Sequence, residues 1–136
     1  MDIERAREFM RIHHRAVLAT HRTDGLPQLS PVTVGVDAVG RAVISTRETA
    51  VKTRNLARDP RASLCVMTDR FFGEWIQVEG KAEVMRLPDA MDLLVDYYRR
   101  ISGEHPDWDD YRAAMRREQR VLVSITLTRA GPDISG

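Results

Sequence analysis

Hydroxyl and basic side chains come together near the middle of the chain, where a strand is expected to end and a short helix to begin. Ser45, Thr46 and Thr49 supply hydroxyl groups, and the first N–H groups of a helix have no partner within it. Such amides attract negative charge. Lys52 and Arg54 would add mobile cations in the first two helical turns. The pattern predicts an anion-binding pocket, although a solvated connector would have the same local pattern.

A second candidate segment is the strand pattern Gln28–Thr33, which contains a proline. Pro31 has no N–H to donate to a ladder, so strand pairing is interrupted at that point. An interruption of this kind gives a ligand access to the backbone, and an edge strand without function would show the same pattern. Both interpretations remain open at this stage.

Metal-binding and hydrolytic patterns are not found. His13 and His14 are adjacent and so point to different helix faces, while His21 and His105 have no cysteine or carboxylate partner at ligand spacing. The chain also has no Gly-x-Ser-x-Gly elbow. The acidic cluster Glu104–Asp110 is explained by a helix start, where Asp107 caps and the next carboxylates complement the helix dipole. The sequence therefore predicts no metal site and assigns no catalytic residue.

Composition narrows the class of protein. The chain has 136 residues and a net charge of +1 with 30% charged residues, so no global field draws it to nucleic acid or to anionic lipid. It is long enough for one core but short for a two-lobed enzyme, which makes a site shared between subunits plausible. Cys65 lies in an apolar strand pattern and is interpreted as a structural thiol. Without a signal peptide or membrane span, a cytoplasmic protein is expected.

Hydrophobic periodicity predicts the elements that position these residues. Residues 1–136 are expected to form one domain with its core at 15–128 and a loose tail at 131–136. A bulge or a bend is expected at Gly80. Hairpin-like spacing excludes a doubly wound parallel sheet and favours a small antiparallel barrel. The expected strands are 16–21, 28–36, 41–46, 62–68, 75–85 and 121–127, and the expected helices are 2–13, 49–58, 89–101 and 107–117.

Short motifs along the chain follow one another in an order typical of one known family. They are Thr20, Asp24-Gly25, Pro27–Val32, Lys52–Leu56, Asp59–Leu64, Val78–Glu83 and Gly103–Arg112. With these motifs the chain resembles the flavin/deazaflavin oxidoreductases of the pyridoxamine 5'-phosphate oxidase-like split barrels, in the branch that binds coenzyme F420. The resemblance covers Arg15 to Leu127. It implies a mainly β (α+β) fold, a six-stranded antiparallel split β-barrel with flanking helices.

The resemblance also implies a homodimer with the cofactor in a groove between subunits. The phosphate-bearing tail would be held by Ser45, Thr46, Lys52, Arg54 and Asn55 of the strand-to-helix segment. The activity implied is hydride transfer between F420 and an unsaturated or heteroaromatic small molecule.

The ring system of the cofactor, by the same resemblance, would lie against Gln28, Ser30, Pro31 and Val32. The proton that accompanies reduction could come from solvent or from a hydroxyl such as Thr33 or Tyr111, and the sequence does not choose.

Two departures from the family pattern bear on the choice of cofactor. Relatives often carry an arginine where this chain has Ala50, and an aromatic residue where it reads Thr128–Pro132. An FMN-dependent oxidase of the pyridoxamine 5'-phosphate oxidase type is the first alternative. A carrier that binds F420 without turnover is the second.

Overall fold

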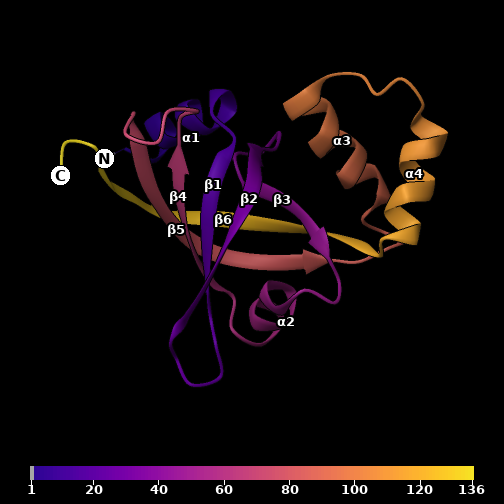
Figure 1. The fold of residues 1–136 in the computed structure, drawn as a ribbon, viewed down its shortest axis with the longest axis horizontal. Coiled ribbons are helices and arrows are strands. Elements are labelled where there is room, and N and C mark those ends of the chain that lie inside the picture. The colour runs from indigo at the N-terminus through magenta and orange to yellow at the C-terminus, as the bar shows by residue number, and fades with distance from the viewer. Residues whose placement is uncertain (1) are drawn as a thin grey trace.

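The computed structural model describes residues 2–136 and contains a closed barrel of six antiparallel strands in the order β1-β2-β3-β6-β5-β4. Figure 1 shows the barrel with one helix at each end and a helical pair beside it. This architecture confirms the predicted fold class. The strands are β1 (Arg15–His21), β2 (Pro27–Val36), β3 (Ala42–Arg47), β4 (Arg61–Met67), β5 (Trp75–Met85) and β6 (Arg120–Asp133), and the helices are α1 (Ile3–Ile12), α2 (Val51–Arg58), α3 (Met91–Ser102) and α4 (Trp108–Arg117).

The barrel interior is formed by the apolar positions that alternate along each strand. Along β1, for example, Ala16 and Leu18 are buried while Val17 and Ala19 face outward. Val34 and Val36 continue the inward face of β2, as the sequence predicted. The alternation therefore fixes which side chains of each strand can reach a ligand outside the barrel.

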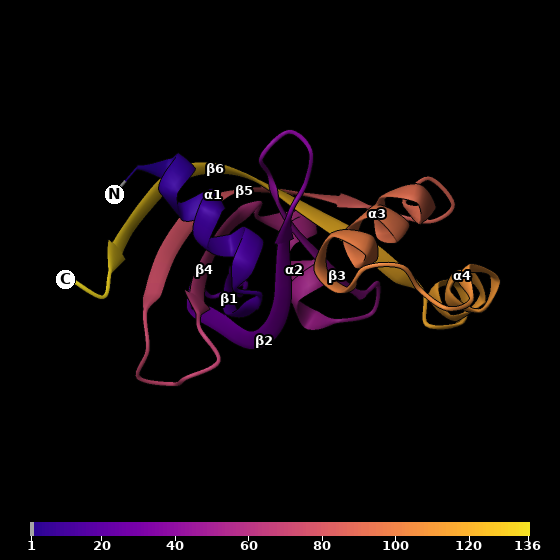
Figure 2. The same cartoon turned by 90° about the horizontal axis from the view of Figure 1, so that it is seen from above.

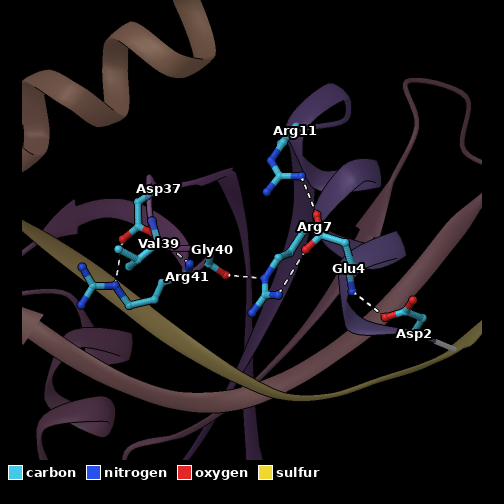
Figure 3. Close-up of polar contacts among 8 residues, drawn as sticks. All are labelled: Asp2, Glu4, Arg7, Arg11, Asp37, Val39, Gly40 and Arg41. Atoms are coloured by element: carbon cyan, nitrogen blue, oxygen red, sulfur yellow. Dashed lines mark hydrogen bonds and ion pairs between the residues drawn. The ribbon is translucent and has the colours of Figure 1, made fainter.

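Helix α1 closes one end of the barrel, and α2 lies at the opposite end (Figure 1). Figure 3 shows how α1 is attached to the β2–β3 turn: the Arg7 Nε donates to the Gly40 carbonyl oxygen at 2.9 Å. Glu4 pairs with Arg7 and with Arg11 at 3.3 and 3.1 Å. In the turn itself, Asp37 accepts hydrogen bonds from the backbone of Val39 and Arg41, and Gly40 has a φ of +88°, which favours glycine.

Helices α3 and α4 pack beside β3 and β6 around a separate small core that includes Val43, Leu94 and Leu122. Asp107 caps α4 by accepting a hydrogen bond from the Asp110 amide at 3.1 Å, as predicted. Helix α3 contacts β2 near Thr33 and Gly35. The outer surface of β1, of β4 and of the first part of β2 is left uncovered by the helices (Figures 1 and 2). Within residues 2–136, no helix combines the length and the apolar character needed to cross a bilayer.

The end of the chain differs from the sequence expectation. Strand β6 continues to Asp133, and the Ile134 amide donates to the Trp75 carbonyl oxygen at 3.1 Å. The prediction of a loose tail from residue 131 is therefore wrong for Gly131–Asp133, because β5 is long enough to pair with this segment. The bulge predicted at Gly80 is confirmed by a register shift between Glu79 and Gly80.

Candidate functional site

A split between β2 and β3 forms the centre of the candidate site. The two strands pair only from Val34 to Val36 on β2, opposite Ile44 to Ala42 on β3. Beyond these residues, β2 stays with β1 as far as Pro27, and β3 stays with β6 as far as Arg47. The edge of β2 that includes Pro31 is consequently unpaired on the β3 side, which accords with the missing N–H of proline.

Tyr97 of α3 stands across this split. Its hydroxyl donates a hydrogen bond to the Thr33 carbonyl oxygen at 2.8 Å. Burial raises the pKa of Tyr97, while the backbone of Ser45 and the Arg120 guanidinium oppose that rise. The phenol oxygen thus lies between the backbones of Thr33 and Ser45, where the two strands have stopped pairing. A side chain takes the place of the absent ladder contact at the top of the split.

Helix α2 begins two residues later than predicted, at Val51, and its N-cap Ala50 provides no side-chain hydrogen bond. None of the three hydroxyl groups singled out in the sequence, those of Ser45, Thr46 and Thr49, caps this helix. Instead, the Thr53 hydroxyl donates back to the Arg47 carbonyl oxygen at 2.6 Å and secures the turn that precedes the helix. The first N–H groups of α2 remain without a capping side chain, so they are available to an anion.

Lys52 lies in the first turn of α2 and is half-buried. Burial lowers the pKa of Lys52, and the positive charge of Arg120 lowers it further. Within residues 2–136 its ammonium group makes no ion pair, unlike Arg120, which pairs with Glu118 at 2.9 Å. A partly desolvated cation without a carboxylate partner is a suitable group for binding a phosphate.

The nine predicted cofactor residues divide between the two faces of the barrel wall. Those that face outward or into solvent are Pro31, Ser45, Lys52 and Arg54, and those that face the interior or are buried are Gln28, Ser30, Val32, Thr46 and Asn55. Only the first group can offer side chains to a ligand in the split. Thr46 is 4% exposed, so it could contribute only backbone atoms.

Arg120 is the residue that sequence reasoning missed. It lies at the start of β6, opposite Arg47 in the β3–β6 register, and it influences the pKa values of both Lys52 and Tyr97. The Arg47 guanidinium also approaches Glu118, at 3.8 Å. A basic residue at the first position of a strand gives no local signal of function. Arg120 comes near Lys52 only because β3 pairs with β6.

Comparison with known proteins agrees with this geometry. The family model for pyridoxamine 5'-phosphate oxidase matches residues 3–131. The chain belongs to the pyridoxamine 5'-phosphate oxidase family. The conserved hypothetical protein Rv2991 from Mycobacterium tuberculosis is similar in structure, with a TM-score of 0.75 and 27% identity over 96% of this chain and 82% of that one.

Two further solved structures share the fold of this pyridoxamine 5'-phosphate oxidase family member. One is an F420 reductase with a TM-score of 0.69 and 20% identity, covering 91% of this chain and 94% of that one. The other is a heme binding protein from Mycobacterium smegmatis with a TM-score of 0.68 and 22% identity, covering 96% of this chain and 54% of that one. Likeness at this level of identity shows the fold.

Asn55, which the resemblance assigned to the cofactor, forms hydrogen bonds within the protein. Its Nδ2 donates to the Thr20 hydroxyl at 3.1 Å, and the Thr20 hydroxyl donates to Gln28 Oε1 at 3.2 Å. Arg58 Nη2 donates to Asn55 Oδ1 at 3.0 Å and to the His21 carbonyl oxygen at 2.6 Å. This buried network attaches α2 to β1 and β2, and so sets where Lys52 stands relative to the split.

Replacing Asn55 with alanine is expected to lower the free energy of unfolding by about 1–3 kcal/mol, because the buried Thr20 hydroxyl loses a partner. Urea denaturation followed by circular dichroism measures the change. Arg54→Ala is the matched control, because Arg54 is exposed on the same helix and its loss should change stability by less than about 0.5 kcal/mol. If Asn55→Ala and Arg54→Ala lowered the free energy of unfolding equally, Asn55 would not be the residue that attaches α2 to the barrel.

The two hydroxyl candidates for proton delivery differ in their surroundings. The Tyr111 hydroxyl donates to the Leu94 carbonyl oxygen at 2.8 Å, and burial, with Tyr97 nearby, raises the pKa of Tyr111 to about 12. That hydrogen bond joins α4 to α3, so Tyr111 is a poor proton donor. Thr33 is exposed beside the split, and its hydroxyl is free to meet a ligand there.

The residues present fit a phosphate-bearing planar cofactor. The Ser30 hydroxyl is buried without a hydrogen-bond partner within residues 2–136, which is unusual for a native protein, and it lies on the unpaired part of β2. Lys52 and the uncapped amides of α2 suit the phosphate, and the open edge of β2 suits the ring. The lysine without an ion pair and the unpaired edge of β2 are the two observations that favour a ligand in the split.

Proposed function

We propose that this protein is an F420-dependent oxidoreductase that transfers a hydride between the deazaflavin and an unsaturated or heteroaromatic small molecule. The observation that carries the proposal is Lys52: a half-buried ammonium group in the first turn of α2, without an acidic partner within residues 2–136 and close enough to Arg120 to feel its charge. Membership of the pyridoxamine 5'-phosphate oxidase family and the structural likeness to an F420 reductase support it.

The charge around the split favours F420 over FMN. F420 carries a phosphodiester and an acidic glutamate tail, which need positive charge over a longer distance than one terminal phosphate does. Arg47, Lys52, Arg54 and Arg120 are spread over α2 and the ends of β3 and β6, and Glu118 is the carboxylate that pairs with two of them. The net positive charge therefore extends beyond a single phosphate pocket.

In the proposed enzyme, the protein binds the cofactor and the substrate, orients them and excludes water from the site. Lys52 and the first amides of α2 would hold the phosphate group, and Pro31 and the neighbouring β2 backbone would support the ring. F420 supplies the hydride chemistry when bound. Tyr97 holds the strands at the top of the split, and the Thr33 hydroxyl stands where it could hold a proton for the substrate.

The proposal includes a homodimer. The outer face of β2, β1, β4 and β5 carries apolar side chains that no helix covers, and this outer sheet face continues to the open edge of β2. A monomer rarely exposes so continuous an apolar surface. A second copy would cover it and narrow the groove over the split. The members of the outer sheet face are Val17, Ala19, Leu29, Pro31, Cys65, Met67 and Trp75.

Placing a charge at the middle of the outer sheet face should give a monomer. Val17→Glu is expected to prevent dimerisation, because the carboxylate would be desolvated in the interface. Sedimentation velocity measures the mass. Val39→Glu is the control, because Val39 is 71% exposed in the β2–β3 turn away from this face, and it should stay dimeric. A monomeric native protein at tens of micromolar would contradict the dimer.

Titration of the pure apoprotein with F420 and with FMN tests the cofactor assignment. Fluorescence of each cofactor reports binding, and F420 is expected to bind the more tightly. A protein that purifies yellow with an FMN spectrum would instead support an oxidase of the pyridoxamine 5'-phosphate oxidase type.

A carrier without turnover is the second candidate, and the structural likeness to a heme binding protein favours considering it. Single-turnover mixing of the protein with reduced F420 and a panel of nitroaromatic and unsaturated carbonyl compounds separates the two. An enzyme oxidises the bound cofactor, whereas a carrier only protects it.

A further inference from the structure

A second cavity adjoins the split on the side of α3 and α4. Its volume is about 400 Å³, and Thr33, Ser45, Tyr97, Tyr98, Tyr111 and Arg120 are among the residues that line it. The rings of Tyr98 and Tyr111 meet edge to face with their centroids 5.1 Å apart. Tyr111 is only 6% exposed and its hydroxyl is bonded to the Leu94 carbonyl oxygen, so it supports the Tyr98 ring from behind. The partly exposed ring of Tyr98 offers a flat apolar surface, which suits a planar ligand.

Positive charge exceeds negative charge at the mouth of this cavity. Glu118 Oε1 accepts hydrogen bonds from Nε and Nη2 of Arg120 at 3.1 and 2.9 Å, and the same oxygen is 3.8 Å from Arg47. One carboxylate therefore serves two arginines, and Lys52 is close enough for Arg120 to lower its pKa. Neither bond to Glu118 uses Arg120 Nη1, which leaves one edge of the guanidinium available to a ligand.

We infer that this cavity holds the substrate and that the substrate is a planar molecule with an anionic group, such as a carboxylate, bound by Arg120. The inference rests on the proposed function, because the split beside the cavity is assigned there to the cofactor. The partly exposed rings of Tyr97 and Tyr98 would contact the planar part, and the free edge of the guanidinium would bind the carboxylate. Glu118 opposes such binding by like charge, so it limits the affinity.

A pair of probes that differ in charge tests the inference on the full-length apoprotein. Isothermal titration calorimetry compares 4-nitrobenzoate with its uncharged methyl ester. The carboxylate is expected to bind about ten-fold more tightly, in keeping with one charged hydrogen bond. Arg120→Met should abolish this preference while leaving the affinity for the ester unchanged, which shows that the cavity is intact.

Two variants separate ligand binding from a structural role of Arg120. Glu118→Gln should strengthen carboxylate binding, because the competing charge is removed. Arg129→Met is the matched control: Arg129 is exposed on the same strand, and its loss should leave both affinities unchanged. If Arg120 served only to hold Glu118 in place, Arg120→Met and Glu118→Gln would change the affinity for the carboxylate in the same direction.

Three results would overturn the inference. Equal affinity for the carboxylate and the ester would show that the cavity does not recognise an anionic group. A preference for the carboxylate that survives Arg120→Met would show that a residue other than Arg120 binds it. Displacement of bound 4-nitrobenzoate by F420 would assign the cavity to the cofactor. Because the probe titrations contain no cofactor, a protein that binds the probes as expected but fails to bind F420 would refute the proposed function separately.

Discussion

Replacement of Lys52 by alanine is expected to weaken binding of F420 at least about ten-fold, in line with the loss of a charged hydrogen bond to phosphate. The ammonium group has no acidic partner within residues 2–136, so its removal leaves no carboxylate unpaired and the fold should be retained. Fluorescence titration measures the affinity. Loss of the positive charge also relieves its repulsion with Arg120, so the melting temperature should not fall.

Two further variants define what Lys52 contributes. Lys52→Arg keeps the charge and should retain part of the affinity, because a guanidinium can also bind a phosphate but has a different shape. Lys81→Ala is the control for removal of a lysine, since Lys81 is exposed on β5. An unchanged dissociation constant for Lys52→Ala would exclude this residue from the cofactor site, and with it the observation on which the proposed function depends.

The second large effect is expected at Gly80, at the bulge where β5 pairs with β6. A Cβ added there would collide with the backbone carbonyl oxygen of Thr126 and come within 2.9 Å of the Ile125 Cγ2. Backbone cannot move aside as a side chain tip can. Gly80→Ala should therefore lower the free energy of unfolding by about 3 kcal/mol, at the upper end for overpacking. Chemical denaturation monitored by tryptophan fluorescence measures this loss.

The neighbouring residue provides the comparison for Gly80. Lys81→Ala changes an exposed side chain on the same strand and should alter stability by less than about 0.5 kcal/mol. If Gly80→Ala were as stable as Lys81→Ala, β5 and β6 would have to lie further apart at the bulge than the structure places them.

Much of the fold could be predicted from the sequence because strand alternation and helix spacing are local signals. The interior positions of β1 and β2 alternate in sequence as they do in the barrel, and the cap of α4 is read directly from Asp107. The ends of elements were less predictable. Strand β6 extends to Asp133 because β5 offers a partner along its whole length, and that partner cannot be seen in the local pattern.

The candidate site was predictable only in part, because a strand pattern does not say which face meets the ligand. Ser45 and Thr46 are adjacent in sequence, yet Ser45 lines the outer cavity and Thr46 is buried. Asn55 lies near Lys52 on the same helix, but hydrogen bonds to Thr20 and Arg58 occupy it.

The sequence by itself determined the barrel strands, the interruption at Pro31 and the basic helix with Lys52, because each depends on residues that are neighbours along the chain. Only the tertiary structure decided that β2 and β3 separate beyond Val34 and that Arg120 stands beside Lys52. Both features come from pairing between strands far apart in sequence. The positive charge of the site therefore depends on closure of the barrel, because the pairing of β3 with β6 places the turn after β3 next to Arg120, the first residue of β6.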